Sequence, residues 1–285
     1  MSRAIVAVLG LLAWATTAHA QKPVCAFSSD GAPGWVLCGT ISGDATDAEL
    51  ARAAERSRAS GFQWIVQIGY NSPVLQHAGD VSAAVKARFD RFGLWPFVAA
   101  TAYGEEWHEH CLGGAFFAAP LWIPAWSPAC GDLVVQWLSV QHARMKAVTG
   151  KPVLWITGTV APGRLVPTST DFVAVDYYPQ DGQPFAAIEP VFVMAEQYTD
   201  LPLVLVMRWF KNTGPYQGPL WHTGAADPLD EWAAGYARLA QHPRVVALMG
   251  FLWQSRPWAQ LVGLEDMPAT HAAVVAALRA RGIIR

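Results

Sequence analysis

Short apolar runs recur along the chain, and each is followed by polar or aromatic residues and then by a stretch with helical periodicity. The runs lie at residues 36–41, 64–68, 96–100, 153–156, 172–175, 203–207 and 248–253. They consist mostly of Val, Ile, Leu, Phe, Ala and Trp, without clean alternation of polar and apolar positions. This pattern is typical of strands that are buried on both faces of a parallel sheet.

The segments between these runs predict helices. Thr46 and Glu49 form a capping-box pattern that starts the first helix, and Gly61 ends it before the next strand. Further helices are expected over residues 80–93, 132–148, 185–198 and 268–281, and another starts at Asp227, with Pro228 at its first helical position. This alternation of strand and helix indicates parallel βα units.

The predicted fold is α/β: a (β/α)8 TIM barrel formed by a single domain over residues 21–285. Seven strands are evident where a complete barrel needs eight, and the eighth is either residues 24–28 or part of residues 115–123. The connection from residue 28 to residue 36 is too short for a crossover helix, so the barrel is expected to be irregular or incomplete at its first strand. A doubly wound open sheet is the alternative, but no G-x-G-x-x-G or P-loop pattern supports it.

The first twenty residues have the pattern of a secretory signal peptide. Arg3 precedes an apolar run over residues 4–15, and Ala18-x-Ala20 is a small-residue cleavage pattern. No later apolar run is long enough to cross a bilayer, so we expect a secreted or periplasmic monomer without a stable membrane anchor. The chain has 20 basic and 22 acidic residues and no basic block, which argues against nucleic acid as a partner.

Four cysteines in an exported chain indicate two disulfides. Three connectivities can join them. The pairs Cys25 with Cys38 and Cys111 with Cys130 close the shortest loops, and the second would pin a long insertion. No C-x-x-C pair supports a structural metal instead.

Acids and aromatic residues follow the predicted strands. Glu105 and Glu106 come after the run at 96–100, Asp176 ends the run at 172–175, and Arg208 ends the run at 203–207. Because the carboxyl ends of barrel strands meet at one face, where barrel enzymes build their active sites, we expect these side chains to share one site.

The segment Thr170 to Pro179, which reads TDFVAVDYYP, resembles the sixth strand of TIM-barrel glycoside hydrolases. The segments LPLVLVM at 201–207 and GFLW at 250–253 resemble their seventh and eighth strands. The resemblance places Glu105 and Glu106 after strand four, where the large retaining clan has its acid/base residue. That clan also has a Glu nucleophile at the end of strand seven, where this chain has Met207-Arg208-Trp209, so the second acid is predicted to be Asp176.

Glycosidic cleavage needs one protonated carboxyl group and one ionised carboxylate. Glu105 or Glu106 can supply the first and Asp176 the second, and no cofactor is required. A sugar site also combines flat aromatic rings with hydrogen-bonding groups. The predicted substrate-binding residues are Tyr70, Asn71, Tyr103, Trp107, Tyr177, Tyr178, Arg208, Trp209, Trp253 and Gln254.

Two other functions fit the same residues. Glu106, His108 and His110 could form a zinc or manganese site of a metal-dependent hydrolase, although no third His is fixed by the pattern. A carbohydrate-binding barrel that has lost catalysis would explain the missing strand-seven Glu. Fold alone does not separate these hypotheses.

Overall fold

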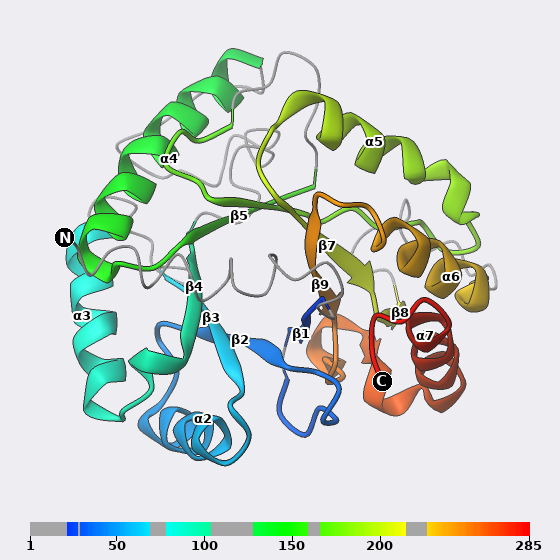
Figure 1. Ribbon diagram of the computed structural model, residues 1–285, viewed down its shortest axis with the longest axis horizontal. Helices are drawn as coiled ribbons and strands as arrows, with labels where there is room; N and C mark the ends of the chain where they lie inside the picture. Colours follow the sequence, from blue (N-terminus) through cyan, green and yellow to red (C-terminus); the bar gives the residue numbers. More distant parts are fainter. Residues whose placement is uncertain (1–21, 28, 69–77, 104–127, 159–165, 215–226) are drawn as a thin grey trace.

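The computed structural model describes residues 22–27, 29–68, 78–103, 128–158, 166–214 and 227–285, without the side chains of residues 128–133 and 259. Its centre is a closed barrel of eight parallel strands, shown in Figure 1. The strands are β1 (Val24–Ala26), β2 (Cys38–Ser42), β3 (Gln63–Gln67), β4 (Val98–Ala102), β5 (Val153–Thr157), β6 (Phe172–Val175), β7 (Leu203–Arg208) and β9 (Val245–Phe251). The predicted TIM-barrel fold is therefore confirmed.

β1 is the strand that brings the number of barrel strands to eight. β1 pairs in parallel with β2 on one side and with β9 on the other, which closes the barrel. Of the two candidates for the eighth strand, residues 24–28 are the one that joins the barrel, whereas residues 115–123 lie outside the described residues. The segments that resemble the sixth, seventh and eighth strands of glycoside hydrolases form β6, β7 and β9, which are the sixth, seventh and eighth strands of the barrel.

Six helices surround the strands in the described part of the chain (Figure 1). They are α2 (Asp47–Ser60), α3 (Ala78–Arg91), α4 (Pro128–Thr149), α5 (Glu189–Tyr198), α6 (Leu229–Leu239) and α7 (Pro268–Ala280). The capping box of α2 is confirmed, because the Thr46 side chain accepts from the Glu49 amide and the Glu49 carboxylate accepts from Thr46. Gly61 ends this helix in the left-handed region, with φ of 72°. None of the described helices is both long and apolar enough to cross a membrane.

Several predicted elements start a few residues away from the observed ones, and proline accounts for two of these differences. The strand predicted over residues 96–100 is β4 at Val98–Ala102, because Trp95–Phe97 form a 3-10 turn around Pro96. The helix predicted over residues 185–198 is divided: Phe185–Ala187 form a 3-10 turn, and α5 starts at Glu189 with a Pro in its first turn. In both cases proline, which lacks an amide hydrogen, stands where the regular element begins.

The connection from β1 to β2 contains turns and no helix. Cys25 and Cys38 lie directly opposite each other on these two strands and form a disulfide, which confirms the first predicted pair. The second predicted pair lies outside the described side chains. Arg56 of α2 donates to the carbonyl oxygens of Ser29 and Ala32, so a helix side chain holds this short connection in place.

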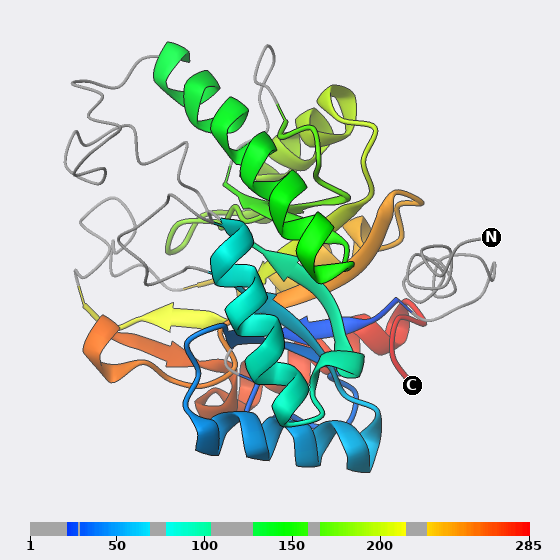
Figure 2. The same cartoon turned by 90° about the vertical axis from the view of Figure 1, so that its left-hand side faces the viewer.

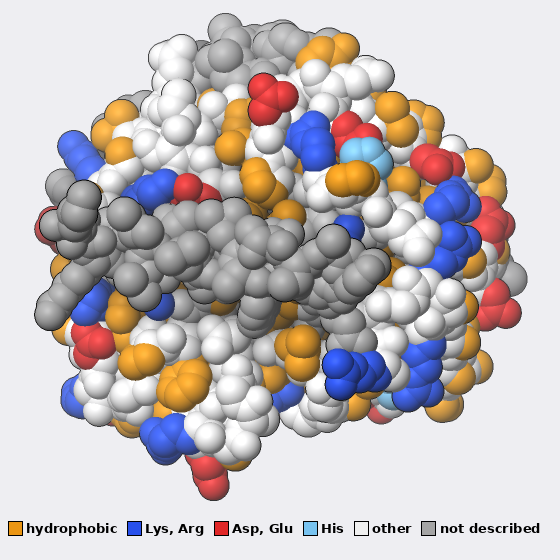
Figure 3. Space-filling model, viewed as in Figure 1, with side chains coloured by type: hydrophobic (Ala, Val, Ile, Leu, Met, Phe, Trp, Pro, Cys, Tyr) orange, Lys and Arg blue, Asp and Glu red, His pale blue; other side chains and the backbone are white. Residues whose placement is uncertain are grey.

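The buried side chains form two layers. Those inside the barrel are mostly small or medium-sized, such as Ile65, Ala100 and Leu154, with Phe27 and Phe210 as larger members. The layer between the barrel and the helices holds the largest side chains, including Trp64, Trp95, Trp155, Trp209, Trp232 and Trp253. Much of the tryptophan in this chain therefore fills the helix–barrel interface. On the face in Figure 3, exposed hydrophobic side chains are dispersed among polar and charged ones.

An apolar cavity of about 30 Å³ lies at the base of the barrel interior. Its lining includes the disulfide of Cys25 and Cys38, together with Ala100, Phe172 and Ala247. These residues stand within the first three positions of their strands, so the cavity marks the amino-terminal part of the barrel.

Candidate functional site at the carboxyl end of the barrel

Asp176 is the acid that the described structure places at the carboxyl end of the barrel. It directly follows β6, and its amide donates to the carbonyl oxygen of Thr157 at 2.7 Å, which continues the pairing of β5 and β6. Ala174 and Tyr178, two residues before and after it, both belong to the barrel-interior cluster. Because side chains alternate along a strand, Asp176 shares the interior register. Its side chain is mostly buried, with 7% of the residue surface exposed.

The surroundings of Asp176 include Tyr236 of α6. Burial raises the pKa of the Tyr236 hydroxyl, and the negative charge of Asp176 raises it further. The same hydroxyl donates to the carbonyl oxygen of Tyr177 at 3.5 Å. Tyr236 therefore stays protonated and supports the backbone that carries Asp176.

Four aromatic rings fill the barrel interior beside this acid. Phe251 contacts Phe27, Tyr178 and Phe210, with ring centroids 5.1, 5.9 and 5.5 Å away. Tyr178 and Phe210 also pack edge to face at 5.3 Å. We call these four residues the aromatic plug. Each of them follows or ends one of the strands β1, β6, β7 and β9, so the plug forms part of the floor of the carboxyl-terminal face.

Arg208, the last residue of β7, is buried in a polar cluster. Its guanidinium donates to the carbonyl oxygens of Pro179 at 2.5 Å and Phe210 at 3.2 Å, and to the Asp181 carboxylate at 2.5 Å. A second carboxylate oxygen, from Asp227, lies 3.6 Å away. This Arg208 cluster joins the segment after β6 to β7 and to the start of α6.

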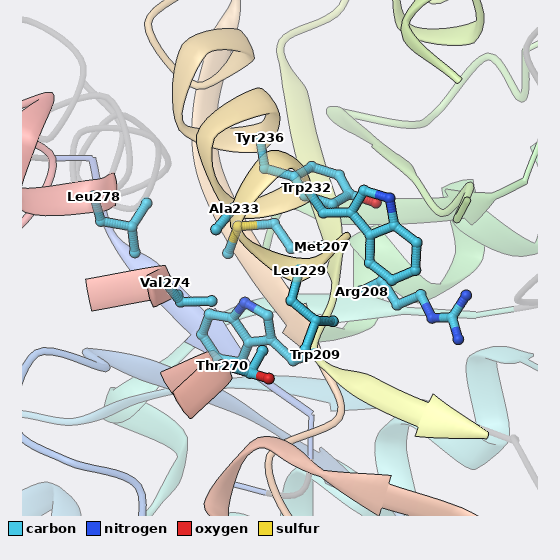
Figure 4. Close-up of a pocket in the computed structure, with 10 residues that line it drawn as sticks. All are labelled: Met207, Arg208, Trp209, Leu229, Trp232, Ala233, Tyr236, Thr270, Val274 and Leu278. Atoms are coloured by element: carbon cyan, nitrogen blue, oxygen red, sulfur yellow. The ribbon is translucent and has the colours of Figure 1, made fainter. Parts of the chain in front are cut away.

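The charges of this cluster are unequal, because one guanidinium faces two carboxylates. Burial raises the pKa of the Asp227 carboxyl, and this effect outweighs the attraction of Arg208. The Asn212 amide also donates to Asp181 at 3.4 Å. In Figure 4 the Arg208 guanidinium points away from Val274 and Leu278. Arg208, Val274 and Leu278 are among the residues that line a void of about 10 Å³ between β7 and helices α6 and α7. The Arg208 side chain is 1% exposed.

Three of the predicted substrate-binding rings lie in the layer between the barrel and the helices: Tyr103, Trp209 and Trp253 are at most 5% exposed. Trp209 packs on Trp35 at 5.6 Å and fills the space left by Gly250, where a Cβ atom would come within 1.8 Å of the indole. Each ring therefore packs the fold, and its role in binding substrate stays a prediction.

Tyr103 also takes part in a buried polar arrangement with α4. Its carbonyl oxygen lies 3.1 Å from Nε2 of His142, and the Thr170 hydroxyl lies 3.0 Å from Nδ1. A carbonyl only accepts, so Nε2 carries the hydrogen and Nδ1 accepts from Thr170. Burial lowers the pKa of His142 to about 4, which keeps the ring neutral.

The other predicted site residues are placed as follows. Tyr177 and Gln254 are half-buried, and Tyr177 packs against the outer layer. Glu105, Glu106, Trp107, Tyr70 and Asn71 lie outside the described residues, as do His108 and His110. The described structure thus brings Asp176, Tyr178 and Arg208 together at one end of the barrel. Among the described residues, no group of three or more His, Cys, Asp or Glu side chains could hold a metal ion.

Sequence reasoning missed Phe27, Phe210 and Phe251 of the plug, and it missed Asp181 and Asp227 as the partners of Arg208. The available signal for the plug was the two-residue period, since Phe210 follows Val204, Val206 and Arg208 on one face. No local pattern pairs Arg208 with acids that lie 27 residues before it and 19 residues after it.

Solved glycoside hydrolases have the same fold. A GH113 β-mannanase from Alicyclobacillus acidocaldarius is 14% identical, with a TM-score of 0.54 over 92% of this chain and 98% of that chain. A GH128 endo-β-1,3-glucanase from Amycolatopsis mediterranei is 14% identical, with a TM-score of 0.51 over 89% and 99%. A GH5-4 broad-specificity endoglucanase from an uncultured bacterium is 10% identical, with a TM-score of 0.52 over 85% and 80%.

No protein-family model matches this chain, and no curated protein matches it. At these identities the likeness to solved structures defines the fold alone. The chain has a TIM-barrel fold like that of glycoside hydrolases, as its sixth, seventh and eighth strands predicted.

Proposed function

We propose that this chain is a secreted or periplasmic glycoside hydrolase that cleaves a poly- or oligosaccharide with two carboxyl groups. Asp176 is the ionised carboxylate of this proposal, and Glu106 or Glu105 is the protonated acid. The observation that carries the proposal is the position of Asp176 at the carboxyl end of a closed barrel, two residues before Tyr178, whose ring packs against the barrel-interior cluster. This is the end at which barrel enzymes assemble their catalytic residues.

Two features support the substrate class and the compartment. The solved structures with the same fold act on β-mannan, β-1,3-glucan and other glucans, so we take β-linked polysaccharides as the first candidates. A disulfide between Cys25 and Cys38 suits an oxidising compartment, in agreement with the predicted signal peptide. Neither acid requires a cofactor for its role.

The environment of Arg208 supports an inverting mechanism. The clan that this chain resembles has its nucleophile at the end of strand seven, and here a buried guanidinium occupies that position. Asp176, one strand earlier, would then act as a base on a water molecule instead of attacking the sugar directly. Inverting enzymes separate the two carboxyl groups by roughly 6.5 to 9.5 Å, which leaves room for that water.

The test is hydrolysis by the purified protein of residues 21–285. β-Mannan, β-1,3-glucan and β-1,4-glucan are incubated separately with the enzyme, and the products are identified by mass spectrometry. Asp176→Asn and Glu106→Gln should each slow cleavage by roughly a hundredfold or more, because each group transfers a proton in the transition state. Glu105→Gln identifies which of the adjacent acids is used.

Asp90→Asn is the matched control, because Asp90 is a half-exposed carboxylate that pairs with Lys86 on α3. It should cleave at the wild-type rate. Unchanged rates in Asp176→Asn would remove this residue from the mechanism. Loss of turnover in EDTA that zinc or manganese restores would favour the metal-dependent hydrolase with Glu106, His108 and His110.

A non-catalytic carbohydrate-binding barrel is the second candidate, and the buried Arg208 is the observation that favours it. A protein that has lost its strand-seven acid can keep an aromatic sugar site without catalysis. Retention of the wild-type protein by a polysaccharide that yields no product, even after prolonged incubation, would support this function over hydrolysis.

A further inference from the structure

Trp258 differs from the other tryptophans that the structure describes. It is 70% exposed, whereas the six tryptophans of the outer packing layer are at most 7% exposed. It is also the most exposed of the large hydrophobic side chains in the described residues, since the next, Val140, is 49% exposed. An indole exposed to this extent is accessible to a ligand, and its flat apolar face can stack on a sugar ring.

The turn that carries Trp258 is well ordered by hydrogen bonds. Arg256 and Leu261 exchange backbone hydrogen bonds of 2.8 and 3.2 Å, which close the turn at its base. The Gln260 amide donates to the carbonyl oxygen of Pro257 at 3.1 Å, within the turn. The Gln260 carbonyl accepts from both the amide and the hydroxyl of Thr213, at 2.8 and 2.9 Å. The indole is thus presented on a fixed backbone.

This turn belongs to a two-stranded arm that projects from the barrel (Figure 2). The arm pairs β8 (Phe210–Asn212) with β10 (Leu261–Gly263) in antiparallel register. β8 directly continues the carboxyl end of β7, and its first residue, Phe210, is part of the aromatic plug. Arg208 donates to the Phe210 carbonyl and to Asp181, which ties the arm to the segment that follows Asp176. The arm therefore holds Trp258 in a fixed relation to the mouth of the barrel.

The surroundings of Trp258 fit a sugar better than a membrane or a protein. Gln254, Arg256 and Gln260 flank it in the same turn and are partly or fully exposed. A saccharide ring offers one apolar face bordered by hydroxyls, so a single indole with hydrogen-bonding neighbours complements it. Membrane and protein contacts need a wider apolar surface than one ring.

We propose that Trp258 is the stacking platform of a remote sugar subsite, which binds a β-linked polysaccharide where it extends beyond the mouth of the barrel. This proposal rests on the carbohydrate-binding part of the proposed function and is independent of hydrolysis. A remote subsite of this kind would favour long chains over short oligosaccharides.

The experiment is affinity electrophoresis of the protein of residues 21–285 in native gels that contain β-mannan, β-1,3-glucan or β-1,4-glucan. Trp258→Ala should weaken binding to the retarding polysaccharide about five- to tenfold, which corresponds to the loss of one aromatic stacking contact. Trp258→Tyr keeps a flat ring and should recover most of the binding. Tyr198→Ala is the matched control, because Tyr198 is a 41% exposed aromatic residue at the end of α5.

A second readout separates this subsite from the catalytic acids. If the protein cleaves the polysaccharide, Trp258→Ala should raise KM for the polymer and leave the rate on a trisaccharide unchanged. Equal retardation of the wild type and Trp258→Ala would overturn the subsite while leaving hydrolysis intact. Trp258-dependent retardation without any product would keep the subsite and refute hydrolysis.

Two further outcomes also count against the subsite. Absence of retardation of the wild type by all three polysaccharides overturns the subsite, whereas hydrolysis is judged by its own products. If Trp258→Ala reduces adsorption to phosphatidylcholine vesicles but leaves polysaccharide binding unchanged, Trp258 is a membrane contact instead.

Discussion

Replacing Arg208 with Met should destabilise the protein by about 3 to 5 kcal/mol at pH 7, because it leaves buried carboxylates without their partner. The guanidinium makes three hydrogen bonds, to Pro179, Phe210 and Asp181. At roughly 1.5 kcal/mol for each bond to a charged group, their loss gives about 4.5 kcal/mol, in the same range. Met fills a similar volume, so a packing cavity adds little to this figure.

The pH dependence of this loss has a definite sign. Burial already raises the pKa of Asp227, and Arg208 opposes that shift. Without Arg208 the folded-state pKa of Asp227 rises further above its unfolded value of about 3.9. The folded variant then binds more protons than the unfolded chain, so its stability is greatest at low pH and is lost as pH rises through the folded-state pKa. The deficit relative to wild type should be larger at pH 7.5 than at pH 5.

Urea unfolding followed by tryptophan fluorescence at several pH values measures both quantities. Arg88→Met is the matched control, because Arg88 pairs with the exposed Asp47 on the surface and should change stability by less than about 1 kcal/mol. Asp181→Asn, which removes one of the two carboxylates and keeps Arg208, should cost less than Arg208→Met. A deficit below about 1 kcal/mol for Arg208→Met, or one that grows as pH falls, would refute the reasoning.

Three further predictions follow from other residues. Burial lowers the pKa of His142 to about 4, whereas its unfolded value is near 6.5, so stability should fall by about 3 kcal/mol as pH drops from 6.5 to 4. His142→Gln should flatten this slope in urea unfolding. Removing the disulfide with Cys25→Ala and Cys38→Ala should lower the free energy of unfolding by about 3 kcal/mol, measured by urea unfolding. If Asp176 acts as a base on water, proton NMR of the first-formed product should show an inverted anomeric configuration, and retention would contradict this mechanism.

The fold was predictable because its signals are local. Thr46 and Glu49 specify a helix start within four residues, and the apolar runs specify buried strands. The first strand was harder, because the chain joins β1 to β2 without a helix and so departs from the βα rhythm. The pairing of β1 with β9, the first and the last strands of the barrel, shows that β1 is the strand that the sequence left open.

The candidate site was predictable only in part. Asp176 could be predicted because it directly follows the apolar run of β6. A strand that is apolar on both faces, however, does not show which of its two alternating sets of residues faces the barrel interior. The sequence therefore predicted Trp209 and Trp253 to bind substrate at the mouth of the barrel, whereas in the structure they pack in the layer between the barrel and the helices. Arg208 was predicted to contact substrate, but in the structure it is buried and pairs with Asp181 and Asp227. These two acids lie far from it in the sequence, so no local pattern could reveal the pairing. Glu105 and Glu106 lie outside the described residues and stay predictions.

The void at the base of the barrel has a mechanical consequence. A volume of 30 Å³ per molecule corresponds to about 18 mL/mol, a substantial part of the roughly 20 to 100 mL/mol by which proteins contract on unfolding. At the opposite end the rings of the aromatic plug pack against one another, with centroids 5.1 and 5.3 Å apart for Phe27–Phe251 and Tyr178–Phe210. Under hydrostatic pressure the barrel should therefore yield first at its amino-terminal end, and the end that carries Asp176 should deform least.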